Sequence, residues 1–494
     1  MKKLPPHWAN TTLENVLEKI VGGGTPSKAN QSFFRGSIPF MTVKDMHTRF
    51  PLDTIDHISA EAILGSATTL VPADTLIIAT RMSLGKIARP KVSTAINQDL
   101  KALFLARGIH KTYIEYFWRS KASHIQELGT GTTVKGIRLD DIRGLSLMLA
   151  PLSEQTRIAN KLDTVLAHVD ACRERLDRIP LILKRFRQSV LAAATSGDLT
   201  ADWRANQAAL LVQIDCVSKA PTTTGNSVLL KILEQKAQWI SNNPEHNEVS
   251  RVKKRVAMFS AKSSRAEGLP NEWCWAKLED ASLLVVDCHN KTAPYEDRGI
   301  ALIRTTNIRD GRFIWDDLRF VSADTHRYWS KRCIPLAGDL VFTREAPMGE
   351  AAIIPNEKQL CLGQRTMLIR PLDQCVPAKY LLIAMLDPKF KERSQKLAVG
   401  TGVKHFRVGD VSDLFLPLPP TAEQNEIIHR VDTLFAFANR LESRLSTART
   451  STDRLTPALL AKAFRGELVR QDPNDEPASE LLKRLAANRA AAPK

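Results

Sequence analysis

A long internal repeat constrains the fold of this chain more than any other feature. When the sequence is shifted by 269 residues, Gly131–Leu199 aligns without a gap on Gly400–Leu468, with 24 identities in 69 pairs. Upstream segments match more loosely, as in Leu4-Pro-Pro-His-Trp8 and Leu269-Pro-Asn-Glu-Trp273. The two copies differ widely between such anchors. The pattern therefore indicates a duplicated unit, in which the anchor motifs are alike and the sequence between them differs.

The second part of each copy carries a helical repeat, in which apolar residues alternate spacings of four and three. The first series is Ile158, Leu162, Val165, Val169, Cys172, Leu176, Ile179, Leu183, Phe186 and Val190, and the second is Ile427, Val431, Leu434, Ala438, Leu441, Leu445, Ala448, Thr452, Leu455 and Leu459. A spacing of 3.5 residues predicts a coiled coil, although polar Thr452 makes it imperfect. Pro180 and Pro457 should each remove one backbone hydrogen bond and kink the helix. We expect the two helices to pair with each other as a spacer of about 60 Å for roughly 40 residues.

The first part of each copy has the pattern of a mixed α+β domain. Strand-like runs such as Ser37–Val43 and Thr366–Ile369 alternate with Gly, Pro and Asp turns, and a helix is expected near 112–128 and 378–397. A further helix is expected at 229–240. The predicted segments are two mixed domains (1–150 and 267–420), two helical segments (151–204 and 421–470), a connector (205–266) and a C-terminal tail (471–494).

Charge and hydropathy limit the class of protein. Lys and Arg outnumber Asp and Glu by 70 to 53, which gives a net charge of +17 and favours a polyanionic partner such as nucleic acid, with a merely basic protein as the alternative. We interpret the basic run Arg251–Arg255 as part of a solvated linker, with phosphate contact as the other reading. Apolar runs are too short to span a bilayer and the N-terminus lacks a secretion signal, so a cytoplasmic location is expected.

No catalytic or metal-binding motif is evident. The seven cysteines form no C-x-x-C pair, and Cys288-His289 is the only adjacent pair of potential metal ligands. The segment Gly22–Lys28 lacks the spacing of a phosphate-binding loop, and the sequence contains no Asn/Asp-Pro-Pro-aromatic loop of the kind that holds a flipped adenine. We therefore predict no cofactor and no metal in this chain.

One nuclease-like pattern requires comparison between the two copies. Asp74, Asp99 and Lys101 could be two metal-binding acids and a lysine that activates water. The second copy has Arg365 in place of Asp99 and methionine in place of the lysine, so the set is lost there. We interpret Asp74, and Asp339 in the second copy, as turn residues that precede strands.

Binding chemistry remains, and it centres on Gly-rich loops that recur in both copies. Gly129–Arg138 and Gly400–Arg407 combine small residues, hydroxyls and cations, which suits contact with phosphate; a simple Gly-rich turn is the alternative. Thr80-Arg81 aligns with Thr343-Arg344, and an arginine here could contact a base edge or form a structural salt bridge. The candidate DNA-binding residues are Arg81, Gln98, Thr130, Thr132, Thr133, Lys135, Arg138, Arg344, Gln364, Thr401, Lys404, His405 and Arg407.

The order and duplication of these motifs resemble the specificity subunit of type I restriction-modification enzymes, over essentially the whole chain. The motifs are L-P-x-x-W at the start of each copy, the Gly-rich loops with lysine, P-L-x-E-Q at the start of a long helix and G-D-L at its end. The resemblance implies an α+β architecture of two target-recognition domains, separated by long helices that pair as an antiparallel coiled coil. Each domain would read half of a bipartite, asymmetric sequence in double-stranded DNA.

The resemblance also implies partners that carry the chemistry. These are methyltransferase (M) subunits, two of them expected, which methylate adenine with S-adenosylmethionine, and restriction (R) subunits that use ATP and Mg. It implies that Glu154, Gln155, Glu423 and Gln424 dock the methyltransferase subunits. Two rival hypotheses remain: a self-contained nuclease or methyltransferase with a duplicated recognition domain, and a coiled-coil scaffold without a role on DNA.

Overall fold

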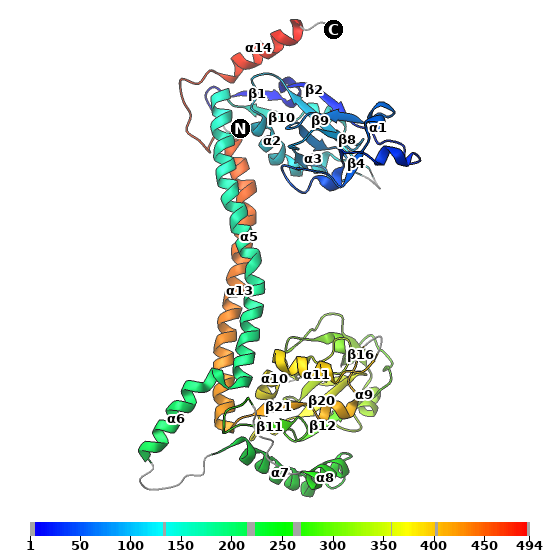
Figure 1. Cartoon of the computed structure of the whole chain (residues 1–494), viewed down its shortest axis with the longest axis vertical. Helices are drawn as coiled ribbons and strands as arrows, with labels where there is room; N and C mark the ends of the chain where they lie inside the picture. Colours follow the sequence, from blue (N-terminus) through cyan, green and yellow to red (C-terminus); the bar gives the residue numbers. More distant parts are fainter. Residues whose placement is uncertain are drawn as a thin grey trace. The chain divides into compact units, whose positions relative to one another are not determined.

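The computed structural model describes residues 5–131, 135–214, 223–259, 268–356, 358–400 and 404–491. The chain forms two compact units: unit 1 consists of Met1–Asp177 and Leu445–Lys494, and unit 2 consists of Arg178–Arg444. Each unit contains one α+β head and a part of both long helices (Figure 1). The compact units therefore divide within the two long helices.

Head 1 (residues 5–150) is built from two four-stranded sheets and a short strand pair. The pair is β1 (Ala9–Thr12) with β10 (Ser146–Leu149); the sheets are β2 (Leu17–Gly22), β9 (Leu100–Leu105), β6 (Leu76–Ala79), β7 (Ile87–Ala88), and β4 (Asp56–Ile58), β3 (Ile38–Met41), β8 (Thr94–Ile96), β5 (Thr69–Val71). Its helices are α1 (Ala60–Leu64), α2 (Lys111–Ser120), α3 (Ala122–Leu128) and α4 (Leu139–Arg143). Only β3 and β8 pair in parallel among the strands described in this head.

Head 2 (residues 268–420) repeats this plan. Its strands are the pair β11 (Cys274–Lys277) and β21 (Phe415–Leu418), the sheet β12 (Leu284–Asp287), β20 (Thr366–Arg370), β17 (Leu340–Thr343), β18 (Ala351–Ile353), the sheet β16 (Arg319–Val321), β13 (Ile300–Ile303), β19 (Leu360–Leu362), and the hairpin β14 (Ile308–Arg309), β15 (Arg312–Phe313). Its helices are α9 (Ala323–Trp329), α10 (Ala378–Leu386), α11 (Pro388–Lys396) and α12 (Val408–Ser412). The first sheet and the short strand pair have the same order in both heads, which confirms the predicted duplication in the fold, whereas the second sheet has four strands in head 1 and three in head 2 among the described residues.

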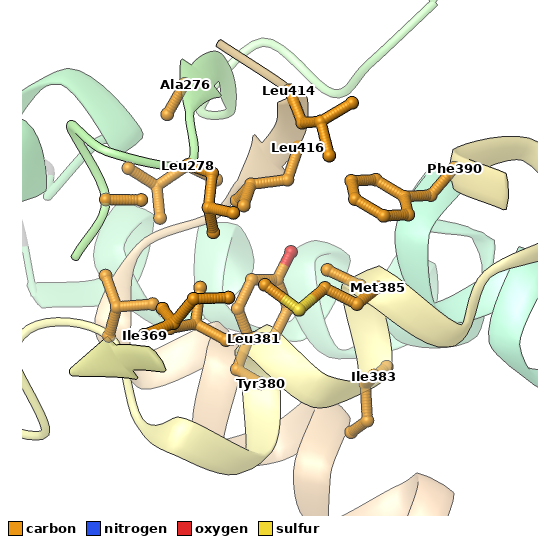
Figure 2. Packing of buried hydrophobic residues seen from close by; sticks show 14 of the residues in the cluster. Ala276, Leu278, Ile369, Tyr380, Leu381, Ile383, Met385, Phe390, Leu414 and Leu416 are labelled. Carbon is orange, nitrogen blue, oxygen red and sulfur yellow. The ribbon is translucent and has the colours of Figure 1, made fainter. Parts of the chain in front are cut away.

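A buried tyrosine fixes the main helix of each head. Tyr380 of α10 is fully buried, and its hydroxyl donates to the Pro417 carbonyl at 2.8 Å. Figure 2 shows Tyr380 and Met385 of α10 on one side of this core and Leu414 and Leu416 on the other. In head 1, Tyr113 of α2 donates to the Met148 carbonyl at the same 2.8 Å. A buried hydroxyl needs such a partner, so the bond selects one orientation of the helix.

Two long helices, α5 (Leu152–Ser196) and α13 (Thr421–Ala463), pass through both units and pair antiparallel within each (Figure 1). In unit 1, Leu162 of α5 packs in one core with Leu460 of α13. In unit 2, Val190 near the end of α5 packs with Ile427 near the start of α13, and Arg187 contacts Glu442 at 2.5 Å. Both helices continue through their internal prolines. The predicted antiparallel coiled coil is therefore confirmed.

The apolar seam departs from a strict heptad near the middle of the helices. Cys172 is exposed, and Leu455 is 45% exposed, although both were predicted to lie in the seam. Thr452 is buried, and its hydroxyl donates to the Ala448 carbonyl of its own helix at 2.8 Å. The next buried residue of this helix is Leu460. It lies eight residues after Thr452 instead of the seven of a heptad, so the line of buried residues shifts by one position around the helix. A local bond within the helix thus makes the polar seam residue tolerable.

The described part of the connector (residues 205–214 and 223–259) is largely helical. It contains α6 (Ala201–Ile214), α7 (Gly225–Asn242) and α8 (Val249–Met258), and α7 covers the helix predicted at 229–240. The basic run 251–255 lies in α8, where Val252 is buried and both Arg251 and Arg255 pair with Glu279 of head 2 at 3.2 and 2.6 Å. The interpretation of this run as solvated linker is wrong, because the run belongs to an amphipathic helix that packs on head 2.

Helix α7 has a counterpart at the far end of the chain, α14 (Ala478–Ala491). The first residue of α7, Gly225, donates its backbone N–H to the Glu272 carbonyl at 2.7 Å, and Ala478 of α14 donates to the His7 carbonyl at 2.8 Å. His7 and Glu272 each precede the tryptophan of an L-P-x-x-W motif. The predicted tail at 471–494 therefore contains a helix that docks on head 1 as α7 docks on head 2.

A cation from each of these helices completes the equivalence. Lys236 of α7 donates to the Glu279 carbonyl at 2.6 Å, and Arg489 of α14 donates to the Glu14 carbonyl at 2.5 Å. Burial lowers the pKa of Lys236 to about 8. The two acceptors, Glu279 and Glu14, occupy equivalent positions in the two heads, so each cation binds the same part of its head. Within the described residues, none of the helices is long and apolar enough to cross a membrane.

Candidate nucleic-acid interface

A short closed loop occupies the same place in each head. In head 1, Thr130 and Gly136 exchange backbone hydrogen bonds of 2.9 Å in both directions; in head 2, Val399 and His405 do the same at 3.0 Å. We call these loop 1 (Thr130–Gly136) and loop 2 (Val399–His405). Gly131 and Gly400 have φ of 121° and 114°, a conformation that favours glycine. The predicted contacts Thr132, Thr133 and Thr401 lie outside the described residues.

Cations lie at the C-terminal end of each loop. Lys135 and Lys404 are exposed, and so are Arg138 and Arg407, which stand at the start of α4 and α12. The backbone N–H groups of both arginines donate to an aspartate three residues on, each at 3.3 Å. The described end of each loop thus presents positive charge, which suits contact with a phosphate chain.

Loop 1 is attached to the turn that follows β6. Ile137 donates its backbone N–H to the Thr80 carbonyl at 3.0 Å, and Arg81 forms an isolated bridge with Gly136. Met82 also donates its backbone N–H to the Lys135 carbonyl at 3.1 Å. The predicted contacts Arg81, Thr130 and Lys135 are therefore brought together on one edge of head 1.

Head 2 repeats this attachment with a different register from the one that the sequence suggested. Phe406, the counterpart of Ile137, donates to the Arg344 carbonyl at 3.0 Å, and the bridge to His405 comes from Glu345. Arg344 is therefore equivalent to Thr80, and Glu345 to Arg81. The alignment of Arg81 with Arg344 is wrong by one residue, which in a strand places a side chain on the opposite face.

The corrected register explains the environment of Arg344. Its side chain is only 14% exposed, with Nη1 at 3.2 Å from the Phe406 carbonyl and Nη2 at 3.5 Å from a carboxylate oxygen of Asp287. These contacts hold the guanidinium inside head 2 and leave it little surface for DNA. We therefore assign Arg344 the structural role that the sequence left open.

An ion pair of reversed polarity lies beside the two loops. In head 1, Arg81 is 61% exposed and lies 3.9 Å from Asp99, which is 14% exposed. In head 2, the equivalent positions hold Glu345, 12% exposed, and Arg365, 52% exposed, which form an ion pair. Asp99 and Arg365 follow the two predicted glutamines, Gln98 and Gln364. Each head thus presents one exposed arginine here. In head 1 it occupies the position that Glu345 has in head 2, and in head 2 it occupies the position that Asp99 has in head 1.

The two glutamines differ in exposure, and one has a partner that the sequence did not suggest. Gln98 is exposed and accepts a hydrogen bond from the Thr25 hydroxyl, whereas Gln364 is half-buried. Thr25 follows Gly23, where a Cβ would lie 2.0 Å from the Ile96 carbonyl. The triple glycine therefore allows close approach of two backbones, and it brings Thr25 to this edge of head 1. The run of glycines in the sequence indicates a close approach of two backbones, but the distant segment that approaches, at Ile96, was not predictable.

The residues predicted to dock partner subunits are buried in the chain itself. Glu154 is 1% exposed and accepts from the Trp8 indole at 2.9 Å and from Gln471 at 2.6 Å. Gln155 is fully buried, and its amide donates to the Ala150 carbonyl at 2.8 Å. These side chains join the start of α5 to head 1 and to the C-terminal segment.

The second copy shows the same arrangement. Glu423 is 1% exposed and accepts from the Trp273 indole at 2.8 Å, from the Thr200 hydroxyl at 2.7 Å and from Arg204. Gln424 is fully buried and donates to the Pro419 carbonyl at 2.9 Å. Direct contact of these four residues with another chain is therefore excluded by their burial, and their polar atoms stabilise each unit instead.

The acids of the nuclease-like pattern have structural partners. Asp74 occupies a turn before β6 with φ of 63°, and its carboxylate lies 2.8 Å from Lys111 and 3.3 Å from Arg89. Asp339 precedes β17 and pairs with Arg370 at 2.7 Å. The structure agrees with our interpretation of both as turn residues. Within the described residues, no group of three His, Cys, Asp or Glu side chains could hold a metal ion.

Known proteins resemble this chain over most of its length. The family model of the type I restriction modification DNA specificity domain matches residues 5–181 and 289–448. The type I restriction enzyme EcoDI specificity subunit of Escherichia coli is 26% identical and covers 99% of this chain and 97% of its own length. The EcoKI specificity subunit of Escherichia coli K12 is 28% identical, over 78% of this chain and 73% of its own.

Solved structures share the fold. The HsdS subunit of Thermoanaerobacter tengcongensis superposes with a TM-score of 0.55 and 16% identity, covering 94% of this chain and 98% of its own. A chain from a structure of the complex assembly and conformational transition of the type I R-M system gives a TM-score of 0.58 and 15% identity, covering 94% of this chain and all of its own.

Proposed function

Because this chain belongs to the type I restriction-modification DNA specificity family, we propose that it reads a bipartite, asymmetric target in double-stranded DNA, one half-site per head. Specificity subunits direct the enzyme to its sequence and are not its catalytic chains, and this chain has that role. Because the side chains of the two heads differ, the two half-sites should differ as well.

One observation carries the proposal: both heads present the same closed loop with exposed cations, beside side chains that differ. Loop 1 and loop 2 share their backbone bonds and their lysine. Phosphate contacts fix the position of a protein on DNA, whereas base contacts specify the sequence. Equivalent loops support equivalent docking of each head on the phosphate chain. The reversed ion pair beside them, Arg81 with Asp99 and Arg365 with Glu345, supports unlike half-sites.

We further propose that partner subunits carry out the chemistry directed by this chain. Methyltransferase subunits would methylate adenine with S-adenosylmethionine, and restriction subunits would cleave with ATP and Mg. The duplicated contacts Trp8–Glu154 and Trp273–Glu423 give each unit the same junction of head and helix, which supports two equivalent docking positions and hence two methyltransferase subunits. Exposed helix residues around the buried Glu-Gln pairs would make these contacts. Such a complex would act in the cytoplasm.

Selection of DNA by the assembled complex tests the proposal. The chain is co-expressed with its methyltransferase partner, the complex selects duplexes from a random library, and the bound fragments are sequenced. We expect two different half-sites separated by an unread gap of constant length. A continuous or palindromic site would contradict the proposal. Methylation or cleavage by the purified chain alone would support the rival hypothesis of a self-contained enzyme, and the complex without this chain is the control.

A further inference from the structure

The reversed ion pair has a geometry suited to reading a base. The carboxylates of Asp99 and Glu345 are 14% and 12% exposed, whereas the guanidinium groups of Arg81 and Arg365 are 61% and 52% exposed. In each head, a nearly buried anion therefore lies against an arginine that faces outward. In head 1 the carboxylate and the guanidinium are 3.9 Å apart, beyond hydrogen-bond distance, so Asp99 attracts Arg81 by charge alone. Glu345 and Arg365 form a closer ion pair in head 2, and in both heads N–H donors of the arginine remain for a ligand.

We propose that Arg81 and Arg365 each contact the edge of a guanine in the half-site of their own head, and that Asp99 and Glu345 position them. This inference rests on the proposed function. An arginine that donates two parallel hydrogen bonds to guanine O6 and N7 must be held in one orientation. A long side chain held by a carboxylate loses less conformational freedom on binding than an unrestrained one.

The position of the pair beside the loops supports this assignment. Arg81 forms a backbone bridge with Gly136 of loop 1, and Glu345 forms the equivalent bridge with His405 of loop 2. A head docked on phosphates through its loop would therefore hold the pair within reach of the neighbouring bases. In head 1 the arginine itself makes the bridge, whereas in head 2 Glu345 makes it and the neighbouring Arg344 donates its backbone N–H to the Arg365 carbonyl at 2.8 Å. Backbone bonds therefore connect the arginine of each head to its loop.

The reversal explains how one frame can read two sequences. In head 1 the arginine comes from the turn after β6, and in head 2 it comes from the residue before β20. The two guanidinium groups therefore start from different backbone positions at the same edge of the head. A different starting point places the donors over a different base pair or strand, so each half-site has its guanine in a different place relative to the loop.

The test uses the complex of this chain with its methyltransferase partner and a duplex carrying the target selected by the wild-type complex. Variants Arg81→Ala and Arg365→Ala are measured against duplexes with each base pair changed in turn. Each variant should bind the selected duplex about tenfold more weakly and lose discrimination at one base pair of one half-site, the two variants affecting opposite half-sites. Arg365→Lys should lose the same discrimination, because lysine keeps the charge but lacks the paired donors.

Matched controls are arginines of exposed ion pairs elsewhere on each head. Arg143 pairs with Asp140 on head 1, and Arg327 pairs with Asp324 on head 2. Arg143→Ala and Arg327→Ala should leave discrimination unchanged at every base pair. If Arg81→Ala or Arg365→Ala instead weakens all duplexes equally and lowers the salt dependence by about one ion, the contact is with phosphate and the inference is overturned.

The carboxylates are tested as positioning residues. Asp99→Asn and Glu345→Gln should relax discrimination at the same base pair as the adjacent arginine variant, while the thermal midpoint of the complex confirms folding. Unchanged discrimination in these folded variants overturns the positioning role. Loss of assembly without DNA would assign the pair to a protein contact and overturn the inference. If the wild-type complex selects no bipartite target, the proposed function itself fails, an outcome separate from all of these.

Discussion

The Trp8 indole donates a hydrogen bond to the buried carboxylate of Glu154, with Nε1 at 2.9 Å from Oε2. The same contact recurs between Trp273 and Glu423 at 2.8 Å. Each bond joins the beginning of a head to the first turn of the long helix that follows it in the chain. Head and helix are thereby fixed as one body within each unit, and the duplicated sequence motifs L-P-x-x-W and E-Q are the two ends of this contact.

Removal of either indole donor should destabilise its own unit. Trp8→Phe and Trp273→Phe keep most of the apolar volume but leave Oε2 of a buried carboxylate without its indole donor, which costs about 1–3 kcal/mol. Urea unfolding followed by circular dichroism measures the loss, and the exposed Trp315 provides the control Trp315→Phe. A loss no larger than that of the control would show that these bonds do not stabilise the units.

The stability of unit 1 should depend on pH through Glu154. Burial raises the pKa of Glu154 above its ordinary value of 4.5, although hydrogen bonds from Trp8 and Gln471 oppose the shift. A carboxyl whose folded pKa is raised stabilises the fold below the unfolded pKa, and this contribution is lost as pH rises through the folded pKa. Glu154→Gln cannot ionise, so it should not show this loss.

The measurement is the free energy of unfolding of both proteins between pH 4 and pH 7. The difference between Glu154→Gln and the wild type should move in favour of the variant as pH rises. Glu127, which is 78% exposed, provides the control Glu127→Gln. Parallel pH profiles for Glu154→Gln and the wild type would contradict the role assigned to burial.

The loop lysines should act on DNA through charge alone. Lys135→Ala and Lys404→Ala should weaken binding of all duplexes to a similar degree and reduce the slope of log K against log salt by about one. The slope is measured by titration of DNA with the complex from about 50 to 200 mM salt. Lys254→Ala in α8 is the control. An unchanged slope in both loop variants would remove the loops from the interface.

The C-terminal helix should be essential to head 1. Leu485 of α14 is 5% exposed in the core of unit 1, so Leu485→Ala should cost about 2–4 kcal/mol. Ile232→Ala in α7 should have the same effect on unit 2, since the two helices are equivalent. Lys483, with a side chain 72% exposed, supplies the surface control Lys483→Ala. A variant as stable as the control would mean that the segment is a dispensable tail.

The repeat and the helices were predictable because their signals are periodic or local. Identity over Gly131–Leu199 established the duplication, and the alternation of apolar residues established the paired helices. The middle of the seam was less predictable, since the burial of Thr452 depends on a bond to Ala448 that compensates its hydroxyl. Apolar spacing alone cannot include such compensation.

The site was only partly predictable because side-chain direction depends on strand register. The common pair Thr-Arg placed Arg344 opposite Arg81, whereas the backbone bonds make Glu345 the equivalent residue. The family resemblance implied that Glu154 and Glu423 dock a partner subunit, yet Glu154 is buried and its partner Trp8 lies 146 residues away in sequence. Polar residues with distant buried partners cannot be distinguished from surface residues by local pattern.

The most direct test of two unlike reading heads is the map of methylated adenines in the genome of cells that express this chain with its methyltransferase partner. Single-molecule sequencing records each modified base and its context. We expect one asymmetric target, made of two different half-sites with a gap of fixed length, and its loss when the chain is deleted. Methylation at a continuous or palindromic sequence, or a map unchanged by deletion of the chain, would contradict it.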